Sequence, residues 1–285
     1  MFIRIKYKEA PKLSNTLSPT NPQNLTPRRI GACNWIGLKT LIEKEIGRFM
    51  NVYMQTLIAP IVTLMLFFAV FTLSFKQHIA EGMGMTAMEF LAPGLLMMTM
   101  IQNAFSNPSS SLIIAKIQGN IVDILMPPLA AWEVLTGLVV GALTRCLLIG
   151  ILGYAAMNLI VPLPVASIWH ILVFGLLGNL MLAALGIMAG LWAEKFDHMA
   201  TVTNFIVTPL TFLSGTFYAL SALPDEWQKI ALFNPFFYMI DGFRAGFIGH
   251  AEVSETTGLA ALVMLDVLLL IGAWAMLKTG YKTKS

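Results

Sequence analysis

Long runs of apolar residues dominate the sequence after residue 50. Six of these runs reach or approach the ~20 residues that an α-helix needs to cross a bilayer. Because a helix satisfies its own backbone groups in lipid, we predict an all-α integral membrane protein with six transmembrane helices. The predicted spans are residues 52–75, 89–109, 132–161, 168–193, 200–220 and 258–278.

The chain before the first span falls into two parts. Residues 1–34 are polar, basic and dotted with proline, which predicts a flexible cytosolic tail ahead of a membrane domain over residues 35–285. Within residues 35–50, apolar side chains recur at helical spacing. This predicts an interfacial helix lying on the membrane, with an ordinary cytosolic helix as the alternative. The apolar positions are Trp35, Leu38, Ile42 and Phe49, and the polar ones are Lys39, Glu43, Lys44 and Arg48.

The segment between the second and third predicted spans carries a short amphipathic pattern, KIQGNIVDILMPPL, at residues 116–129. Its isoleucines can share one helix face, and Pro127-Pro128 ends the helix before the next span. Such a helix on the cytosolic face suits docking onto a soluble partner, and a connector lying on the bilayer explains the pattern equally well. The candidate docking residues are Lys116, Gln118, Asn120, Asp123, Ile124 and Leu125.

The stretch over residues 208–249 is interrupted three times. Gly215 breaks the fifth span, Pro224 breaks the chain again, and Pro235 separates two short amphipathic pieces. Interrupted helices persist at membrane depth only where protein or water covers the freed backbone groups. We therefore predict a broken fifth helix and two re-entrant helices at the outer face, with a simple surface loop as the alternative. The candidate gate residues are Ser214, Gly215, Pro224, Trp227, Asn234, Pro235, Asp241 and Arg244, and the last two are spaced to pair.

The positive charges set the orientation of the chain. Nine of the 18 lysines and arginines precede residue 50, and three follow residue 277. Because cytosolic segments of membrane proteins are rich in these residues, both termini are predicted to be cytosolic, which requires an even number of spans. The composition, 12% charged and 57% hydrophobic, indicates a bilayer environment. The charge pattern does not indicate nucleic-acid binding.

Two charged residues, Arg145 and Asp266, lie inside predicted spans at comparable depth. Because either is costly to expose to lipid, they pair within the bundle, or Arg145 serves as a contact for an anionic substrate or as part of a gate. The pairs Gly137–Gly141 and Gly186–Gly190 allow helices to approach closely. We expect both to pack helices of one subunit rather than to mark a dimer.

Sequence motifs for enzymatic chemistry are missing. The chain has no G-x-x-x-x-G-K-[ST], G-x-S-x-G, H-E-x-x-H or C-x-x-C motif, and its four histidines are scattered. We therefore predict no catalytic residues, no cofactor and no metal site, so active transport would draw its energy from another protein. His78, Met83, Met85 and Met88 have ligand types that suit copper(I), and chance clustering among 18 methionines explains them better.

Four stretches resemble the ABC-2 type permeases, the membrane subunits of bacterial ATP-driven exporters. They are KEIGRFMNVYMQTLIAPIVTLMLFF at 44–68, FLAPGLLMMTMIQNAFSNPSSSL at 90–112, KIQGNIVDILMPPL at 116–129 and TPLTFLSGTFYALSALPDEWQKIALFNPFFYMIDGFRAGF at 208–247. The last is the most specific, and the similarity covers the chain from residue 35 to its end.

The resemblance implies an assembly and a place for each segment. It implies a homodimer, or a related heterodimer, with two separate ATPase subunits that bind ATP and Mg²⁺. Residues 116–129 would hold the coupling helix, and the interfacial helix would also contact the ATPase. Residues 208–249 would border the outer exit of the transport path. The expected location is the bacterial inner membrane, with both termini in the cytoplasm.

The resulting functional prediction is the permease subunit of an exporter that moves an amphipathic, glycan, lipid-linked or drug-like substrate. Met97, Met98, Met100 and Phe105 are candidates for an adaptable lining of the path, although core filling explains them better. The alternative function is a membrane scaffold or regulatory subunit that binds an ATPase without moving cargo. No residue selects among multidrug, polysaccharide and lipid substrates.

Overall fold

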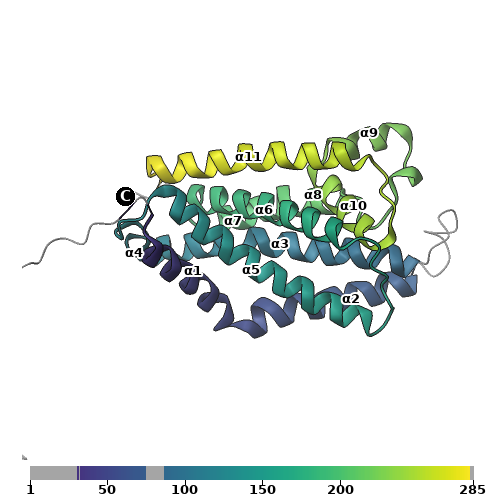
Figure 1. The fold of residues 1–285 in the computed structure, drawn as a ribbon, viewed down its shortest axis with the longest axis horizontal. Coiled ribbons are helices and arrows are strands. Elements are labelled where there is room, and N and C mark those ends of the chain that lie inside the picture. Colours follow the sequence, from purple (N-terminus) through teal and green to yellow (C-terminus); the bar gives the residue numbers. More distant parts are fainter. Residues whose placement is uncertain (1–30, 32, 75–86, 283–285) are drawn as a thin grey trace, which may run out of the picture. The chain divides into compact units, whose positions relative to one another are not determined.

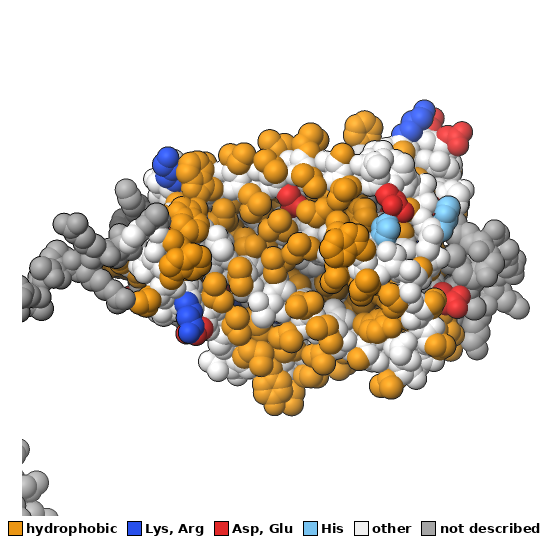
Figure 2. All heavy atoms as spheres, in the orientation of Figure 1, with side chains coloured by type: hydrophobic (Ala, Val, Ile, Leu, Met, Phe, Trp, Pro, Cys, Tyr) orange, Lys and Arg blue, Asp and Glu red, His pale blue; other side chains and the backbone are white. Residues whose placement is uncertain are grey.

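The computed structural model describes residues 31, 33–74 and 87–282, and this part of the chain is built from helices. Most of the predicted tail lies outside the described residues, as do His78, Met83 and Met85. Figure 2 shows hydrophobic side chains covering the middle of one face, with lysines and arginines toward its ends. A surface of this kind suits a bilayer, because charged side chains are stable only near the lipid headgroups.

Helix α1 (Trp35–Met50) has the bounds predicted for the interfacial helix. It begins where the Asn34 side chain accepts a hydrogen bond from the backbone N–H of Gly37, at 3.0 Å, which satisfies one of the free amides of the first turn. A π-helical turn, η1 (Met54–Ile58), leads into α2 (Ala59–Ser74). The first predicted span therefore begins with a turn that bonds its backbone differently from the helix after it.

Four helical segments of the described chain are long and apolar enough to cross a membrane. They correspond to the first, third, fourth and sixth predicted spans. Three are the helices α5, α6 and α11, and the fourth combines η1 with most of α2. Their bounds are Met54–Leu73, Ala131–Asn158 (α5), Ile168–Trp192 (α6) and Glu255–Thr279 (α11).

The second and fifth predicted spans do not qualify by the same measure. Helix α3 (Ala87–Ile117) is 31 residues long, yet it carries many polar side chains. The fifth span consists of α7 (Phe196–Val202), η2 (Thr203–Val207) and α8 (Thr208–Phe212), which are 7, 5 and 5 residues long. Length and apolarity alone therefore do not establish six crossings.

Helix α3 forms the centre of the bundle and packs against α5, α6, α10 and α2 (Figure 1). Its close contact with α6 depends on Gly190, where an added Cβ would lie 3.0 Å from the Cα of Ser109. Helix α1 similarly approaches α5 at Gly141, where a Cβ would lie 2.7 Å from that of Glu45. Both predicted glycine pairs thus pack helices of the same chain, as expected.

The predicted breaks after α8 are present. Gly215 has a φ of +74°, in the left-handed region that glycine adopts without strain, and it directly follows Ser214, the residue two positions after the end of α8. A short 3₁₀ turn, η3 (Leu220–Ala222), precedes α9 (Asp225–Phe233), whose N-cap is Pro224. Helix α10 (Pro235–Ile248) follows directly, and the side chain of its N-cap, Asn234, accepts a hydrogen bond from the Phe236 N–H at 3.1 Å.

Helix α10 differs from its prediction as a one-sided amphipathic helix. The predicted apolar stripe, from Phe236 to Phe247, is buried, and so is the opposite face with Asp241 and Arg244. The reason is tertiary: α10 lies among α6, α3 and α11, so no side of it is left for an aqueous surface. Helix α9 keeps an exposed apolar side, which includes Trp227 and Ile230.

Candidate functional site

A polar strip runs along α3 through the otherwise apolar bundle. It consists of Thr99, Gln102, Asn103, Ser106 and Ser110, whose spacing places them on one helix face. Ser106 is exposed and Gln102 is half-buried, so the strip is not fully covered by the neighbouring helices. Polar groups inside a membrane bundle are costly unless they face partners or a wet cavity, which makes this strip the first candidate for a substrate contact.

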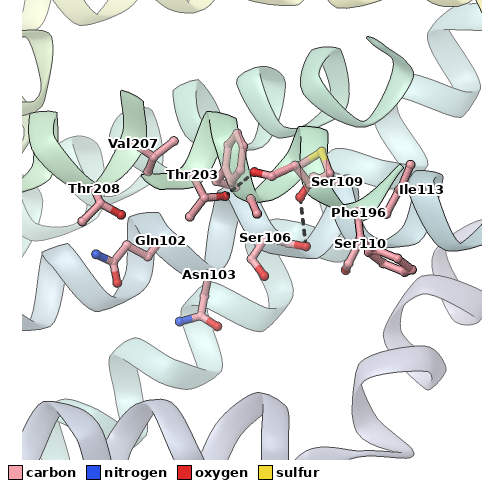
Figure 3. A pocket seen from close by; sticks show the side chains of 13 residues that line it. Gln102, Asn103, Ser106, Ser109, Ser110, Ile113, Phe196, Thr203, Val207 and Thr208 are labelled. Atoms are coloured by element: carbon pink, nitrogen blue, oxygen red, sulfur yellow. Dashed lines mark hydrogen bonds between the residues drawn. The ribbon is translucent and has the colours of Figure 1, made fainter. Parts of the chain in front are cut away.

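Two cavities flank the polar strip. One, of about 570 Å³, lies between α3 and the segment α7–η2–α8. Figure 3 shows its side chains in two rows, with Thr203 and Thr208 on one helix and Gln102 and Ser106 on α3. The other, of about 550 Å³, lies between α3, the η1–α2 segment and α5. Four residues of the strip line both cavities, namely Gln102, Asn103, Ser106 and Ser110.

Arg145 of α5 lines the second cavity and does not pair with Asp266. Its Nη2 donates to Asn103 Oδ1 at 2.6 Å, and its Nε donates to the backbone oxygen of Thr56 at 3.3 Å. Asp266 is only 3% exposed, and neither of its carboxylate oxygens has a partner among the described residues. The predicted alternative of an internal ion pair between the two residues is therefore wrong, because the Arg145 guanidinium is directed to α3 and η1.

Helix α4 (Val122–Leu125) lies at one end of the bundle (Figure 1). The side chain of Glu133, on α5, holds this end together. Its Oε1 accepts the backbone N–H of Asn34 at 2.5 Å, and its Oε2 accepts that of Ala130 at 2.6 Å. The Asn34 side chain also donates to the backbone oxygen of Pro128 at 3.3 Å. One buried carboxylate thus joins the start of α1 to the start of α5. Its role was missed from the sequence, where a single acid near a predicted span gives no sign of a partner 99 residues away.

The predicted coupling segment, residues 116–129, is not one continuous helix: it contains the end of α3 and the short helix α4. Helix α3 continues to Ile117, and Gly119, with a φ of +75°, turns the chain before α4 begins. Gln118, Asn120 and Asp123 are exposed, as a docking surface requires.

Two of the other predicted docking residues face the protein. Ile124 is buried. Lys116 is half-buried, and its Nζ donates to the backbone oxygens of Leu191 and of Ala193, at the end of α6. It caps that helix, so it is not a free surface charge. Leu125 ends α4.

Helix α1 packs its inner face on α5 and α3. That face contains Leu38, Leu41, Glu45 and Phe49, while Trp35 is 72% exposed. The face differs from the predicted stripe because it includes a carboxylate, buried where its Oε1 accepts a hydrogen bond from Ser111 at 2.8 Å. The remaining predicted contact residues divide: Lys39 and Glu43 form an exposed pair 3.7 Å apart, whereas Arg48 turns inward and donates to Asn107 and Ser110.

The opposite end of the bundle is held together by Arg244 of α10. Its Nη1 lies 3.4 Å from Glu252 Oε1, its Nη2 donates to the backbone oxygen of Gly215, and its guanidinium lies over the ring of Phe90. The predicted pair with Asp241 is not formed. Asp241 instead accepts the backbone N–H groups of Glu252 and Val253, at 3.1 and 3.2 Å, so the two residues are linked through the loop before α11.

The other predicted gate residues support the chain around this network. Ser214 is buried, and its hydroxyl hydrogen-bonds to that of Thr216 at 3.0 Å. Asn234 donates to the backbone oxygen of Leu210 at 2.7 Å, which ties the start of α10 to α8. Pro235 is the first residue of α10, where it needs no backbone hydrogen bond.

The sequence profile of ABC-2 type transporters matches residues 37–248, which include the polar strip and both ends of the bundle. The chain belongs to the ABC-2 type transporter family. It is 37% identical over 251 residues to the inner membrane transport permease YadH of Escherichia coli K12, covering 88% of this chain and 98% of the relative. It is 25% identical over 209 residues to nodulation protein J of Rhizobium leguminosarum bv. viciae, covering 70% and 76%.

A third relative, matched over a shorter stretch, is the capsule polysaccharide export inner-membrane protein BexB of Haemophilus influenzae. The two chains are 29% identical over 113 residues, which is 39% of this chain and 42% of the relative. As a member of this family, the chain is a permease. Membership of this family implies an ATP-binding partner in an ABC transporter.

Proposed function

We propose that the chain is the membrane subunit of an ATP-driven exporter, in which the polar strip of α3 and its two cavities form part of the substrate path. The observation that carries this proposal is a strip of incompletely covered polar side chains inside a membrane bundle, with cavities of about 570 and 550 Å³ on its two sides. Cavities of this size accommodate a small ligand or the head of a larger one.

The proposed topology has six crossings, with α3 and the broken α7–η2–α8 segment as the second and fifth. Helix α3 is long enough for a crossing, and its polar strip explains its lower apolarity. We place α4 and both termini in the cytosol, because lysine and arginine are concentrated there. The end with α9 and α10 then faces outward. The proposed location is the bacterial inner membrane, which the name of the YadH relative supports.

The proposed assembly contains two permease copies and two ATPase subunits, which hold ATP and Mg²⁺. The exposed residues Gln118, Asn120 and Asp123 would contact the ATPase, together with Lys39 and Glu43 of α1. Glu133 joins the start of α1 to the start of α5, which follows α4 in the chain. A displacement of either contact surface by the ATPase is then passed to the other. The two surfaces would therefore move as one.

Helix α3 provides the link between the energy input and the outer end. Its cytosolic end carries Lys116, bonded to the end of α6, and its outer end carries Phe90, in contact with Arg244. A rigid shift of α3 would therefore change the polar strip and the Arg244 network together. ATP binding at the cytosolic end would thus be coupled through one helix to opening at the outer end.

The proposed substrate is an amphipathic molecule, with a glycan or lipid-linked glycan favoured over a drug. The names of two relatives refer to nodulation and to capsule polysaccharide export. Two of the four predicted lining residues support core filling, because Met97 and Met100 are buried in the main core. Phe105 is also buried there, but it lines the first cavity and stays a candidate contact. Met98 lines the second cavity and remains a candidate contact.

The test replaces Asp123 with Arg and compares it with Asp225→Arg on α9, at the opposite end. If the proposal holds, Asp123→Arg reduces both co-purification of an ATP-binding-cassette subunit and ATP-dependent uptake into inverted vesicles, and Asp225→Arg leaves co-purification unchanged. The transported compound is first identified by its loss from the surface of a deletion strain. Unchanged binding and uptake in Asp123→Arg would contradict the coupling assignment. ATPase binding without uptake of any compound missing from the strain would favour the scaffold.

A further inference from the structure

Arg145 is a cation without a counter-charge in the second cavity, between α3, η1–α2 and α5. Its side chain is 7% exposed. The groups that accept from it, Asn103 Oδ1 and the backbone oxygen of Thr56, are both neutral. Among the described residues it forms no ion pair and Nη1 has no acceptor. A buried guanidinium of this kind is costly, which calls for an explanation beyond packing.

The other guanidinium that lines this cavity is already neutralised. Arg48 Nε lies 3.3 Å from Glu45 Oε2. Its Nη2 donates to Asn107 and its Nη1 donates to Ser110. Arg48 therefore has both its charge and its hydrogen bonds satisfied inside the protein, and Arg145 supplies the uncompensated positive charge of the cavity.

The rest of the cavity lining consists of neutral side chains, many of them hydrogen-bond donors. None of the described residues that line it is an aspartate or a glutamate. Gln102 and Ser106 face the cavity without a hydrogen bond from their side chains to any described residue. Guanidinium, amide and hydroxyl donors around one space are the groups that bind oxyanions. The polar lining residues besides the two arginines are Gln55, Thr56, Thr63, Thr99, Gln102, Asn103, Ser106 and Ser110.

The geometry points to an anion subsite: this cavity holds the phosphate, sulfate or carboxylate head of an amphipathic substrate, with Arg145 as the cationic contact. The inference rests on the proposed function, because it takes the occupant to be cargo. The apolar lining beside it, including Leu64, Leu95 and Met98, suits the acyl or other apolar part of the same molecule.

A purely structural role for Arg145 is the competing explanation. Its bond to the Thr56 carbonyl stabilises the π-helical turn η1, where the helix bonding pattern changes. That structural role depends on the hydrogen-bonding geometry of the guanidinium and does not require its charge to be uncompensated. The two explanations therefore predict opposite effects when a carboxylate is placed beside Arg145.

The experiment is native mass spectrometry of the full chain in a neutral detergent. It counts bound dioleoyl phosphatidic acid and, as the neutral match, dioleoylglycerol. We expect wild type to bind the phosphatidic acid at least about tenfold more tightly, as for one strong charge-assisted contact. Excess inorganic phosphate distinguishes the source of the anion: displacement of the lipid indicates a site for free phosphate as well, and its retention indicates recognition of the whole lipid.

Three variants test Arg145 directly. Arg145→Gln is expected to lose this preference about tenfold, and Arg145→Lys to keep part of it because the charge remains. Lys229→Gln, on the exposed side of α9, is expected to leave it unchanged. Equal binding of phosphatidic acid by Arg145→Gln and wild type would overturn the proposal, as would a wild type that does not distinguish the two lipids.

Asn103→Asp covers the case in which Arg145→Gln does not fold. It places a carboxylate where Asn103 Oδ1 already lies 2.6 Å from Arg145 Nη2, so the packing is kept and the charge is neutralised. We expect weaker lipid binding with an unchanged or higher melting temperature. Unchanged binding would overturn the subsite. The lipid-binding assay needs neither ATPase nor transport. A negative result would therefore leave the permease proposal intact. Conversely, a failure of the ATPase-coupling test would leave the anion subsite intact.

Discussion

The guanidinium carbon of Arg244 lies 3.8 Å from the centroid of the Phe90 ring, which joins α10 to the first turn of α3. The same side chain contacts Gly215, at the break after α8, and Glu252, in the loop before α11. Four segments of the chain therefore meet at one buried cation. Opening this end of the bundle requires the separation of at least one of these contacts.

Replacing Arg244 with Met is expected to destabilise the protein strongly. The change leaves Glu252 buried without its cation, and removing one partner of a buried ion pair costs about 3–5 kcal/mol. Arg244→Lys keeps the charge and loses the planar contact with Phe90, so a smaller loss is expected. The apparent melting temperature in detergent measures both. Lys229→Met on α9 is the control, and an equal shift in the control would contradict the assignment.

Glu252 is expected to give the protein a measurable pH dependence. Burial raises the pKa of its carboxyl group, and the nearby Arg244 opposes this only in part. The folded state therefore keeps the proton to a higher pH than the unfolded state, whose glutamate titrates near pH ~4.3. The associated stability is present below that pH and is lost as the pH rises through the raised pKa of the folded protein.

The measurement is the apparent melting temperature as a function of pH, for wild type and Glu252→Gln. Because glutamine does not titrate, the difference between the two proteins isolates this group from Asp241 and the other acids. The wild type should lose stability relative to the variant as the pH rises above ~4.3. A difference that is constant across the pH range, or that changes in the opposite direction, would contradict the raised pKa.

The sequence predicted the local breaks of the chain better than its buried polar partners. Helix α1 and the turn at Gly215 depend on short-range signals, namely an N-cap asparagine and a glycine at positive φ. Glu45 bonds to Ser111, 66 positions away, and Arg244 to Gly215, 29 positions away. Spacing along one helix cannot reveal such partners, because they are set by how different helices pack. This is why Asp241 was paired with Arg244 wrongly.

The polar strip shows a second limit of sequence reasoning. Gln102, Asn103 and Ser106 lie within a predicted span, but apolar periodicity marks the buried side of a helix and does not identify them. A helical repeat of polar residues inside a span is a signal that could have found them. Arg145 is a candidate from the sequence, and the structure identifies Asn103, rather than Asp266, as its neighbour.

Glu133→Gln is expected to loosen the cytosolic end. Glutamine has one carbonyl oxygen where glutamate accepts two backbone N–H groups, so one of Asn34 and Ala130 loses its acceptor. An unsatisfied buried donor costs about 1–3 kcal/mol. We expect a lower melting temperature and reduced stimulation of the partner ATPase. Glu226→Gln, exposed on α9 at the opposite end of the bundle, is the matched control. If Glu133→Gln stimulates the ATPase as strongly as wild type does, the hydrogen bonds of Glu133 are not needed for coupling to the ATPase.

Gly141 and Gly47 form a pair of positions at which the same substitution should act in opposite directions. A Cβ at Gly141 would lie 2.7 Å from the Cβ of Glu45, so Gly141→Ala must push α1 away from α5 and disturb the buried bond between Glu45 and Ser111. Overpacking of this kind costs about 1–3 kcal/mol. Gly47 lies on α1 with nothing within 4 Å of an added Cβ, so Gly47→Ala should stabilise the helix by about 0.5–1 kcal/mol.

The apparent melting temperature is expected to fall in Gly141→Ala and to rise in Gly47→Ala. If α1 docks on α5 through this glycine, limited proteolysis near residue 50 should also become faster in Gly141→Ala alone, because the displaced helix exposes its backbone. A fall in both variants would indicate a general cost of alanine at the two sites. A rise in both would mean that α1 does not approach α5 closely in the membrane, and the link between the ATPase contact and the bundle would have to run through α4 alone.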